Sequence, residues 1–318
     1  MCQRSDLPTE GQWADRLTTE EVEATLSYVT VLEGVGWATP MLALTRPIIE
    51  RLRVGITDKE TYRKNPLTSA EAAFLYELRF AHAIHRAGAT AIYEHKTEVQ
   101  DSSVDFKVLA PRPWLVELVS LRESAAVRGA TTRAGVFTSL MLSTDANDPS
   151  QSEEGEVIKC QERIGEKVFD RTKKTPVKFP ADHGCNKLIM VDARGYLGSA
   201  IGNAWDWHHI AYGAMGLAGH LVRFWTDPKT KERQPIRGIF ESANKRAAIQ
   251  TVQQRIHFIG FVCEKTFSPE ELGSVSIYVY NPQLFSSHAA AVAAFKTFPL
   301  ANDKLLRPTN SSSTDDAT

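Results

Sequence analysis

Three carboxylates in this sequence stand where the surrounding residues are apolar. Glu117 lies within the run LVELV, and Asp105 lies on the face of a short alternating segment opposite Val104 and Phe106. Glu77 projects from the apolar stripe of a predicted helix, where its neighbours at helical spacing are Ala73, Phe74, Phe80, Ala81 and Ile84. A buried carboxylate without a partner is costly, so such residues usually have a counter-charge or a metal ion nearby.

The spacing of Asp105 and Glu117 predicts that they are neighbours across a hairpin. The turn residues Ala110–Pro113 separate two predicted strands, and a turn centred near Pro111 sets Asp105 opposite Glu117. Two adjacent carboxylates repel each other unless a cation lies between them. Hard oxygen ligands favour Mg²⁺ or Mn²⁺ over zinc, so the pair is a candidate metal site.

These carboxylates are carried by a run of well-defined predicted elements. A helix begins with the capping-box pattern Thr68-x-x-Glu71 and ends near Gly88. It is followed by predicted strands at 90–95, 103–109 and 114–121, a helix at 153–171 and a strand at 187–192. The short connections predict two antiparallel hairpins, and the strand–helix–strand part predicts a right-handed parallel crossover.

The order of these elements resembles the core of the PD-(D/E)XK nuclease superfamily. The matching residues are Glu77 in ELRF, Asp105 in SVDFKV and Glu117 in WLVELVSL, and the resemblance covers residues 68–192. It implies an α/β fold with a restriction-endonuclease-like mixed sheet, an α-β-β-β-α-β core flanked by helices. It also implies metal-dependent hydrolysis of phosphodiester bonds in DNA, with Asp105 and Glu117 holding Mg²⁺ or Mn²⁺ and Glu77 as a further catalytic residue.

The sequence departs from that family at one catalytic position. The family pattern is Glu-x-Lys, whereas here Val119 follows Glu117 by two residues. Two lysines are candidates for the displaced role. Lys167 lies beside the apolar stripe of the second helix, and its long stem can reach the sheet. Lys107 shares the face of Asp105, but the predicted register sets it opposite Leu115. Lys167 is the preferred candidate.

Two alternatives to an active nuclease follow from the same residues. The missing lysine favours a nuclease-like chain that has lost catalysis and binds nucleic acid or a protein partner. In a purely structural interpretation the carboxylates are paired internally, Glu77 with Arg79 or Arg86 and Glu117 with Lys107. Convergence of the three carboxylates in an open cleft separates the first two interpretations from the third.

The rest of the chain predicts extensions to this core. The 318 residues divide into a helical extension (1–67), the core (68–192), a C-terminal elaboration packed on it (193–307) and a disordered tail (308–318). Helices are expected at 19–34, from Pro47 and at 243–254, and strands at 256–263 and 275–280. The formal net charge of −1 excludes binding to DNA by overall charge, so a local patch is required. Scattered cysteines and the absence of a long apolar segment predict a soluble cytoplasmic protein that does not bind membranes. The sequence does not fix the oligomeric state and is compatible with a dimer.

Overall fold

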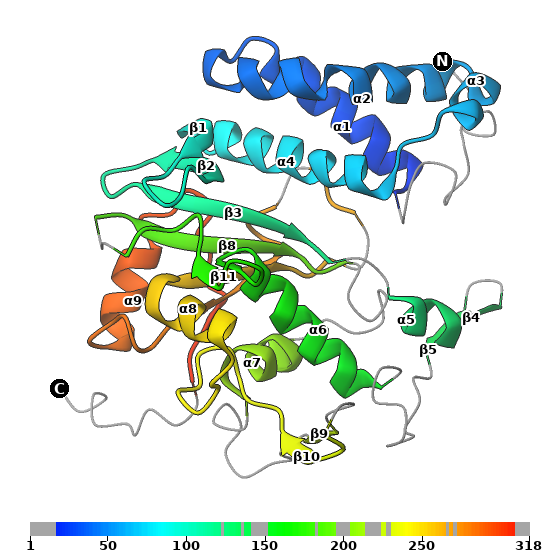
Figure 1. The fold of residues 1–318 in the computed structure, drawn as a ribbon. Coiled ribbons are helices and arrows are strands. Elements are labelled where there is room, and N and C mark those ends of the chain that lie inside the picture. Colours follow the sequence, from blue (N-terminus) through cyan, green and yellow to red (C-terminus); the bar gives the residue numbers. More distant parts are fainter. Residues whose placement is uncertain are drawn as a thin grey trace.

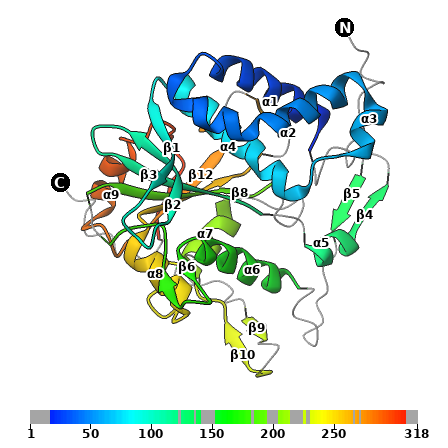
Figure 2. The ribbon, with the colours of Figure 1, turned by 45° about the horizontal axis from the view of Figure 1, so that its top comes forward.

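A seven-stranded mixed sheet forms the centre of the molecule, with helices on both faces (Figure 1). The structure is a computed structural model, and it describes residues 17–121, 124–134, 137–140, 152–181, 184–194, 204–213, 224–226, 230–264, 267–269 and 272–308. In Figure 2 the N-terminal helices lie above the sheet and α6, α7 and α8 lie below it. The protein is thus a layered α/β protein, as predicted.

The helices are α1 (Thr19–Leu32), the 3₁₀ turn η2 (Gly36–Ala38), α2 (Thr39–Thr57), α3 (Lys59–Lys64), α4 (Ser69–Arg86), α5 (Ala125–Ala130), α6 (Glu153–Glu166), α7 (Ala204–Tyr212), α8 (Ala247–Arg255) and α9 (His288–Phe295). The sheet contains β1 (Thr90–Lys96), β2 (Ser103–Leu109), β3 (Trp114–Ser120), β8 (Asn186–Asp192), β11 (Phe258–Val262), β12 (Ser276–Tyr280) and β13 (Leu305–Leu306). Three further hairpins are β4–β5 (Thr131–Ala134, Phe137–Leu140), β6–β7 (Phe169–Asp170, Thr175–Pro176) and β9–β10 (Phe224–Thr226, Arg233–Pro235).

The strand order is β1-β2-β3-β8-β11-β12-β13, and the pairing around β3 is the predicted one. β2 pairs antiparallel with both β1 and β3, whereas β3 and β8 are parallel and are connected through α6. β8 then pairs with β11, so the sheet continues without interruption beyond residue 192. The two strands expected in the C-terminal part are β11 and β12, an antiparallel pair within this sheet.

Two details of the predicted helices are wrong. Pro47 does not begin a helix, because α2 starts at Thr39 and Pro47 lies inside it. Helix α6 ends at Glu166 instead of residue 171, and Lys167 is its C-cap. The chain then turns at once into β6. This end of the helix was not predicted, because the amphipathic pattern of the sequence continues through Val168. The N-terminus of α4 is as predicted, since Thr68 and Glu71 form a complete capping box.

Each face of the sheet has its own hydrophobic core. On one face α1, α2, α4 and α9 cover residues such as Phe106, Trp114 and Val116. On the other face α6, α7 and α8 cover Leu115 and Val119. Strand β3 is buried on both faces, as its continuous apolar sequence predicts. Each buried Leu or Val side chain contributes roughly 1.5–3 kcal/mol, and these contributions offset the cost of enclosing Glu117 in the same strand.

Among the described residues no helix is long and apolar enough to cross a membrane. Among the described residues, Cys160, Cys185 and Cys263 are not joined in disulfides.

Candidate functional site

The predicted carboxylates meet where β2 and β3 separate. The ladder between these strands runs from the Val108–Trp114 pair to the Phe106–Val116 pair, in the register predicted from the turn. Beyond it, β3 remains paired with β8 through to Ser120, whereas β2 remains paired with β1. Asp105 and Glu117 are the next residues on the two diverging strands. Divergence of two central strands leaves space between them for side chains and for a ligand.

Asp105 compensates for the lost strand partner of β3. Its Oδ2 accepts a hydrogen bond from the backbone N–H of Leu118 at 2.6 Å. In a regular ladder a carbonyl of β2 would accept such a bond, because a buried N–H group needs a partner. Asp105 is therefore fixed at the point of divergence, directly beside Glu117.

Glu117 is fully buried and is held by two ammonium groups. Its Oε1 accepts hydrogen bonds from Nζ of Lys167 at 2.9 Å and from Nζ of Lys178 at 2.5 Å. Its Oε2 is also buried but has no hydrogen-bond partner among the described residues. Burial raises the pKa of Glu117, and Asp105 raises it further, against the opposing effect of the two lysines. The carboxylate thus has one oxygen occupied by cations and one oxygen left over.

Glu77 adds a third carboxyl group from the opposite side of the sheet. Its Oε2 accepts a hydrogen bond from the hydroxyl of Tyr93 at 2.7 Å. Burial raises the pKa of Glu77 to about 8, with a further contribution from Asp105 and a smaller one from Glu117. At neutral pH Glu77 is therefore largely protonated, chiefly because burial disfavours its charged form.

Two of the three acidic residues border a small pocket of about 110 Å³ between α4 and α6. Glu77 and Asp105 line it directly, together with Ser120 of β3 and Lys167. Glu117 is not a lining residue, because it is 0% exposed and lies behind the others. The expected convergence of Asp105 and Glu117 in one open pocket is thus only partly met.

Lys167 occupies the place for which the sequence made it the preferred candidate. As the C-cap of α6 it extends toward β3, and the negative charges of Glu117 and Asp105 raise its pKa although burial alone would lower it. Lys107 lies instead opposite Leu115, where its charge acts on His95. The suggested pair between Glu117 and Lys107 is therefore wrong, and Lys167 and Lys178 take that role.

Lys178 was missed by reasoning from the sequence. It follows β7 and has a positive φ of 65°, so no regular pattern predicts its direction. Its backbone N–H is bound by the hydroxyl of Ser102 at 2.8 Å, which fixes the residue against the β1–β2 loop. The only feature of the sequence that could have indicated this lysine is its position next to Phe179, which is buried.

The chemistry of this donor set fits a hard divalent cation. All three acidic groups offer oxygen, Oε2 of Glu117 has no hydrogen-bond partner among the described residues, and Asp105 is near enough to raise the pKa of Glu117. Among the described residues no group of three or more His, Cys, Asp or Glu side chains is arranged so that it could hold a metal ion. Mg²⁺ does not require such a group, because it is usually bound through one or two carboxylates and retains several waters.

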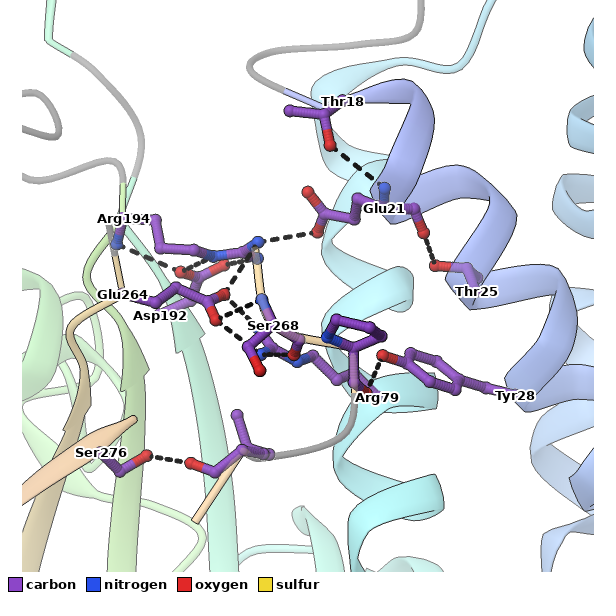
Figure 3. Close-up of polar contacts among 12 residues, drawn as sticks. Thr18, Glu21, Thr25, Tyr28, Arg79, Asp192, Arg194, Glu264, Ser268 and Ser276 are labelled. Atoms are coloured by element: carbon purple, nitrogen blue, oxygen red, sulfur yellow. Dashed lines mark hydrogen bonds and ion pairs between the residues drawn. The ribbon is translucent and has the colours of Figure 1, made fainter. Parts of the chain in front are cut away.

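A second cluster of buried charges lies at the end of β8 and provides a contrast (Figure 3). Arg79 of α4 donates two hydrogen bonds to Glu264 at 2.5 and 2.8 Å and a third to the carbonyl of Ser268 at 2.7 Å. Its guanidinium stacks 4.6 Å from the ring centre of Phe267. The suggested partnership of Arg79 with Glu77 is therefore wrong: the two side chains leave the same helix toward different clusters.

Arg194 completes this second cluster. It binds both carboxylate oxygens of Asp192 at 2.8 and 2.6 Å and reaches Glu21 of α1 at 3.0 Å. Burial alone would raise the pKa of Asp192, but Arg194 holds that pKa below its usual value. We call Glu21, Arg79, Asp192, Arg194 and Glu264 the arginine network. It joins α1, α4 and the sheet, as Figure 3 shows.

Comparisons with protein-family models, with curated proteins and with solved structures found no match to this chain.

Proposed function

We propose that this chain hydrolyses phosphodiester bonds in DNA with the help of a divalent metal ion, and that its catalytic core is a PD-(D/E)XK-like nuclease core. The observation that carries the proposal is the convergence of Asp105, Glu117 and Lys167 where β2 and β3 diverge. A lysine from the end of α6 thereby supplies the ammonium group that Val119 cannot. The element order α4-β1-β2-β3-α6-β8, with α5 and the β4–β5 and β6–β7 hairpins inserted into it, supports the same assignment.

Each side chain has a role that its position permits. Asp105 and the free Oε2 of Glu117 would hold Mg²⁺ or Mn²⁺, which when bound activates water and offsets the charge that develops on the phosphate. Lys167 is 30% exposed and lines the pocket, so it can orient a water molecule or contact a phosphate oxygen. Glu77, protonated at neutral pH and bound by Tyr93, borders the pocket from α4 and can exchange a proton with bound water.

Lys178 acts on Glu117 and not on the pocket. It approaches the same oxygen as Lys167, but it does not line the pocket. We therefore assign it a positioning role, in which it neutralises Glu117 while Lys167 faces the substrate.

Cleavage of supercoiled plasmid tests the proposal, because one nick converts the whole molecule to the relaxed form. Purified protein is expected to relax the plasmid in Mg²⁺ or Mn²⁺, and excess chelator is expected to stop the reaction. E117Q keeps the volume of the side chain but removes a metal ligand, so its activity should be lost. If the folded parent protein cuts in neither metal, or if E117Q cuts equally well, the proposed function is wrong.

One observation favours a second candidate, a nuclease-like chain that binds nucleic acid without cutting it. Both lysines lie on Glu117, which is fully buried, and this arrangement is also a stable internal ion pair. In that case the protein binds DNA with a strong dependence on salt but leaves the plasmid intact in every metal.

A further inference from the structure

The β6–β7 hairpin is the most concentrated positive segment beside the candidate site. Residues 167–178 (KVFDRTKKTPVK) contain five basic side chains and one aspartate, in a chain whose net charge is −1. Both ends of this segment are fixed at the site, because Lys167 and Lys178 bind the same oxygen of Glu117. The positive charge is therefore held next to the pocket and is not distributed over the surface.

The tip of the hairpin is built to present cations to solvent. The single aspartate, Asp170, accepts hydrogen bonds from the backbone N–H groups of Thr172 and Lys173 at 2.8 and 3.0 Å, so it shapes the turn. Lys173 and Lys174 are exposed, and neither forms an ion pair with any described residue. Arg171 reaches Glu162 and Glu166 only at 3.7 and 3.6 Å, at an exposed position where such pairs contribute little.

The base of the hairpin is rigid, which lowers the cost of binding through its tip. Val168 and Phe179 are buried in the core below the sheet. Val177 donates a backbone hydrogen bond to Val168 at 2.8 Å, and Thr175 contacts Gln100 of the β1–β2 loop at 3.3 Å. That loop also carries the exposed Glu98 and Asp101, so the positive surface is confined to the tip. A pre-ordered cationic tip loses little conformational freedom on binding.

We propose that Lys173 and Lys174 of the β6–β7 hairpin bind the phosphate backbone of the nucleic acid that flanks the candidate site. This inference rests on the proposed function and adds where the substrate is held. Five residues of extended chain span at most about 17 Å, so the tip reaches phosphates within about five nucleotides of the bond to be cut. Contacts of this kind are independent of base sequence.

Binding across a salt series tests the hairpin separately from catalysis. A labelled duplex of about 30 base pairs and the corresponding single strand are titrated with full-length protein in chelator, where no cleavage occurs. K173Q/K174Q removes two phosphate contacts and should reduce the slope of log affinity against log salt by about 1.8 on the duplex, or about 1.4 on a single strand. If the slope decreases only with the duplex, the hairpin binds double-stranded nucleic acid, and if it decreases only with the single strand, the hairpin binds single strands.

Two controls define the result. K64Q/K296Q removes the same charge from exposed positions on α3 and at the end of α9, and it should leave the slope unchanged. K173R/K174R keeps the charge and should keep the parent slope. Equal slopes for K173Q/K174Q and the parent, or a parent that binds neither nucleic acid, would overturn the hairpin proposal.

The two proposals fail differently. If the parent cuts plasmid and K173Q/K174Q binds nucleic acid normally, the nuclease proposal stands and the hairpin proposal is wrong. If the parent never cuts but its salt-dependent binding is lost in K173Q/K174Q, the hairpin proposal stands and the nuclease proposal is wrong.

Discussion

The candidate site and the arginine network each bring three carboxylates together with two basic side chains, yet the carboxylates are paired very differently. In the network, planar guanidinium groups bind Glu264 and Asp192 through two hydrogen bonds each. In the candidate site both ammonium groups approach one oxygen of Glu117, while its other oxygen has no partner among the described residues. The first arrangement pairs two carboxylates through both of their oxygens, whereas the second leaves one buried oxygen of Glu117 without a partner among the described residues.

The pKa shifts of Asp192 and Glu77 have opposite directions, although burial also raises the pKa of Glu21 in the arginine network. Arg194 holds the pKa of Asp192 below its usual value, whereas burial raises the pKa of Glu77 to about 8. Buried charge that is fully paired serves the fold. Buried charge that remains unbalanced next to a pocket is typical of a site that binds or transforms a ligand.

The largest effect on stability is expected in the arginine network. R79M leaves Glu264, whose side chain is 2% exposed, without its bidentate partner. Removing one member of a buried ion pair costs about 3–5 kcal/mol in the free energy of unfolding. Urea denaturation measures this loss. R53M breaks the exposed pair with Glu33 and should change stability by less than about 1 kcal/mol. Similar costs for the two variants would contradict the assignment of a structural role.

The order of the elements was predictable from the sequence, but the network was not. A capping box predicts the start of α4. Alternating apolar residues predict β2, and a continuous apolar run predicts β3. Arg79, Arg194 and Glu264 instead meet from elements far apart in the chain, and none has a local pattern. Pro47 was misplaced because the rule that proline begins a helix is a preference, and here packing continues α2 through it.

Prediction of the site shows the same division. Glu77, Asp105 and Glu117 stood out because a charge on an apolar face conflicts with its surroundings. The role of Lys167 could be predicted because the end of α6 points toward the sheet. Lys178 was not, because a positive-φ residue after a short hairpin has no periodicity from which a direction follows.

In the candidate site the corresponding change should affect the rate and not the fold. K167M removes the ammonium group that lines the pocket, while Lys178 still neutralises Glu117. Loss of one group that stabilises charge in a transition state typically costs about 10²–10³ in rate, roughly 3–4 kcal/mol. Single-turnover cleavage measures this effect. K159M alters an exposed lysine of the same helix and should cut at the parent rate. An active K167M would remove Lys167 from the mechanism.

Metal should stabilise the protein through the candidate site alone. Mg²⁺ bound only by the folded state raises the free energy of unfolding by about 2.7 kcal/mol at 100 times its dissociation constant. Thermal unfolding with and without Mg²⁺ measures the shift. D105N removes one ligand and should abolish most of it, whereas R79M should be destabilised and yet retain it. A shift of equal size in D105N would place the metal elsewhere.

A further expected effect concerns the pH dependence of stability. The pKa of Glu77 is about 8 in the folded protein against a usual value of 4.5. Between these values the folded protein keeps a proton that the unfolded chain releases. The stability contribution of Glu77 is therefore fully present below about pH 4.5 and is lost as the pH rises through about 8. The slope is at most about 1.4 kcal/mol per pH unit.

Comparison with E77Q isolates that slope, because glutamine does not titrate. The difference in unfolding free energy between the parent and E77Q should decrease from about pH 5 to pH 8 and then level off. Mg²⁺ should flatten it, since a nearby cation lowers the pKa of a carboxyl group. Parallel curves for the two proteins would show that Glu77 titrates normally.

The most direct test of the contrast between the two clusters is the single-turnover rate of DNA cleavage in Mg²⁺ for E117Q and E264Q. Both changes replace a buried glutamate by an amide of the same size, and both proteins are measured well below their melting temperatures. We predict that E264Q cuts within about tenfold of the parent, because its carboxylate serves only the fold, and that E117Q loses at least about 10³-fold, because a metal ligand is gone. Equal losses in the two variants, or an E117Q protein that cuts like the parent, would contradict the account.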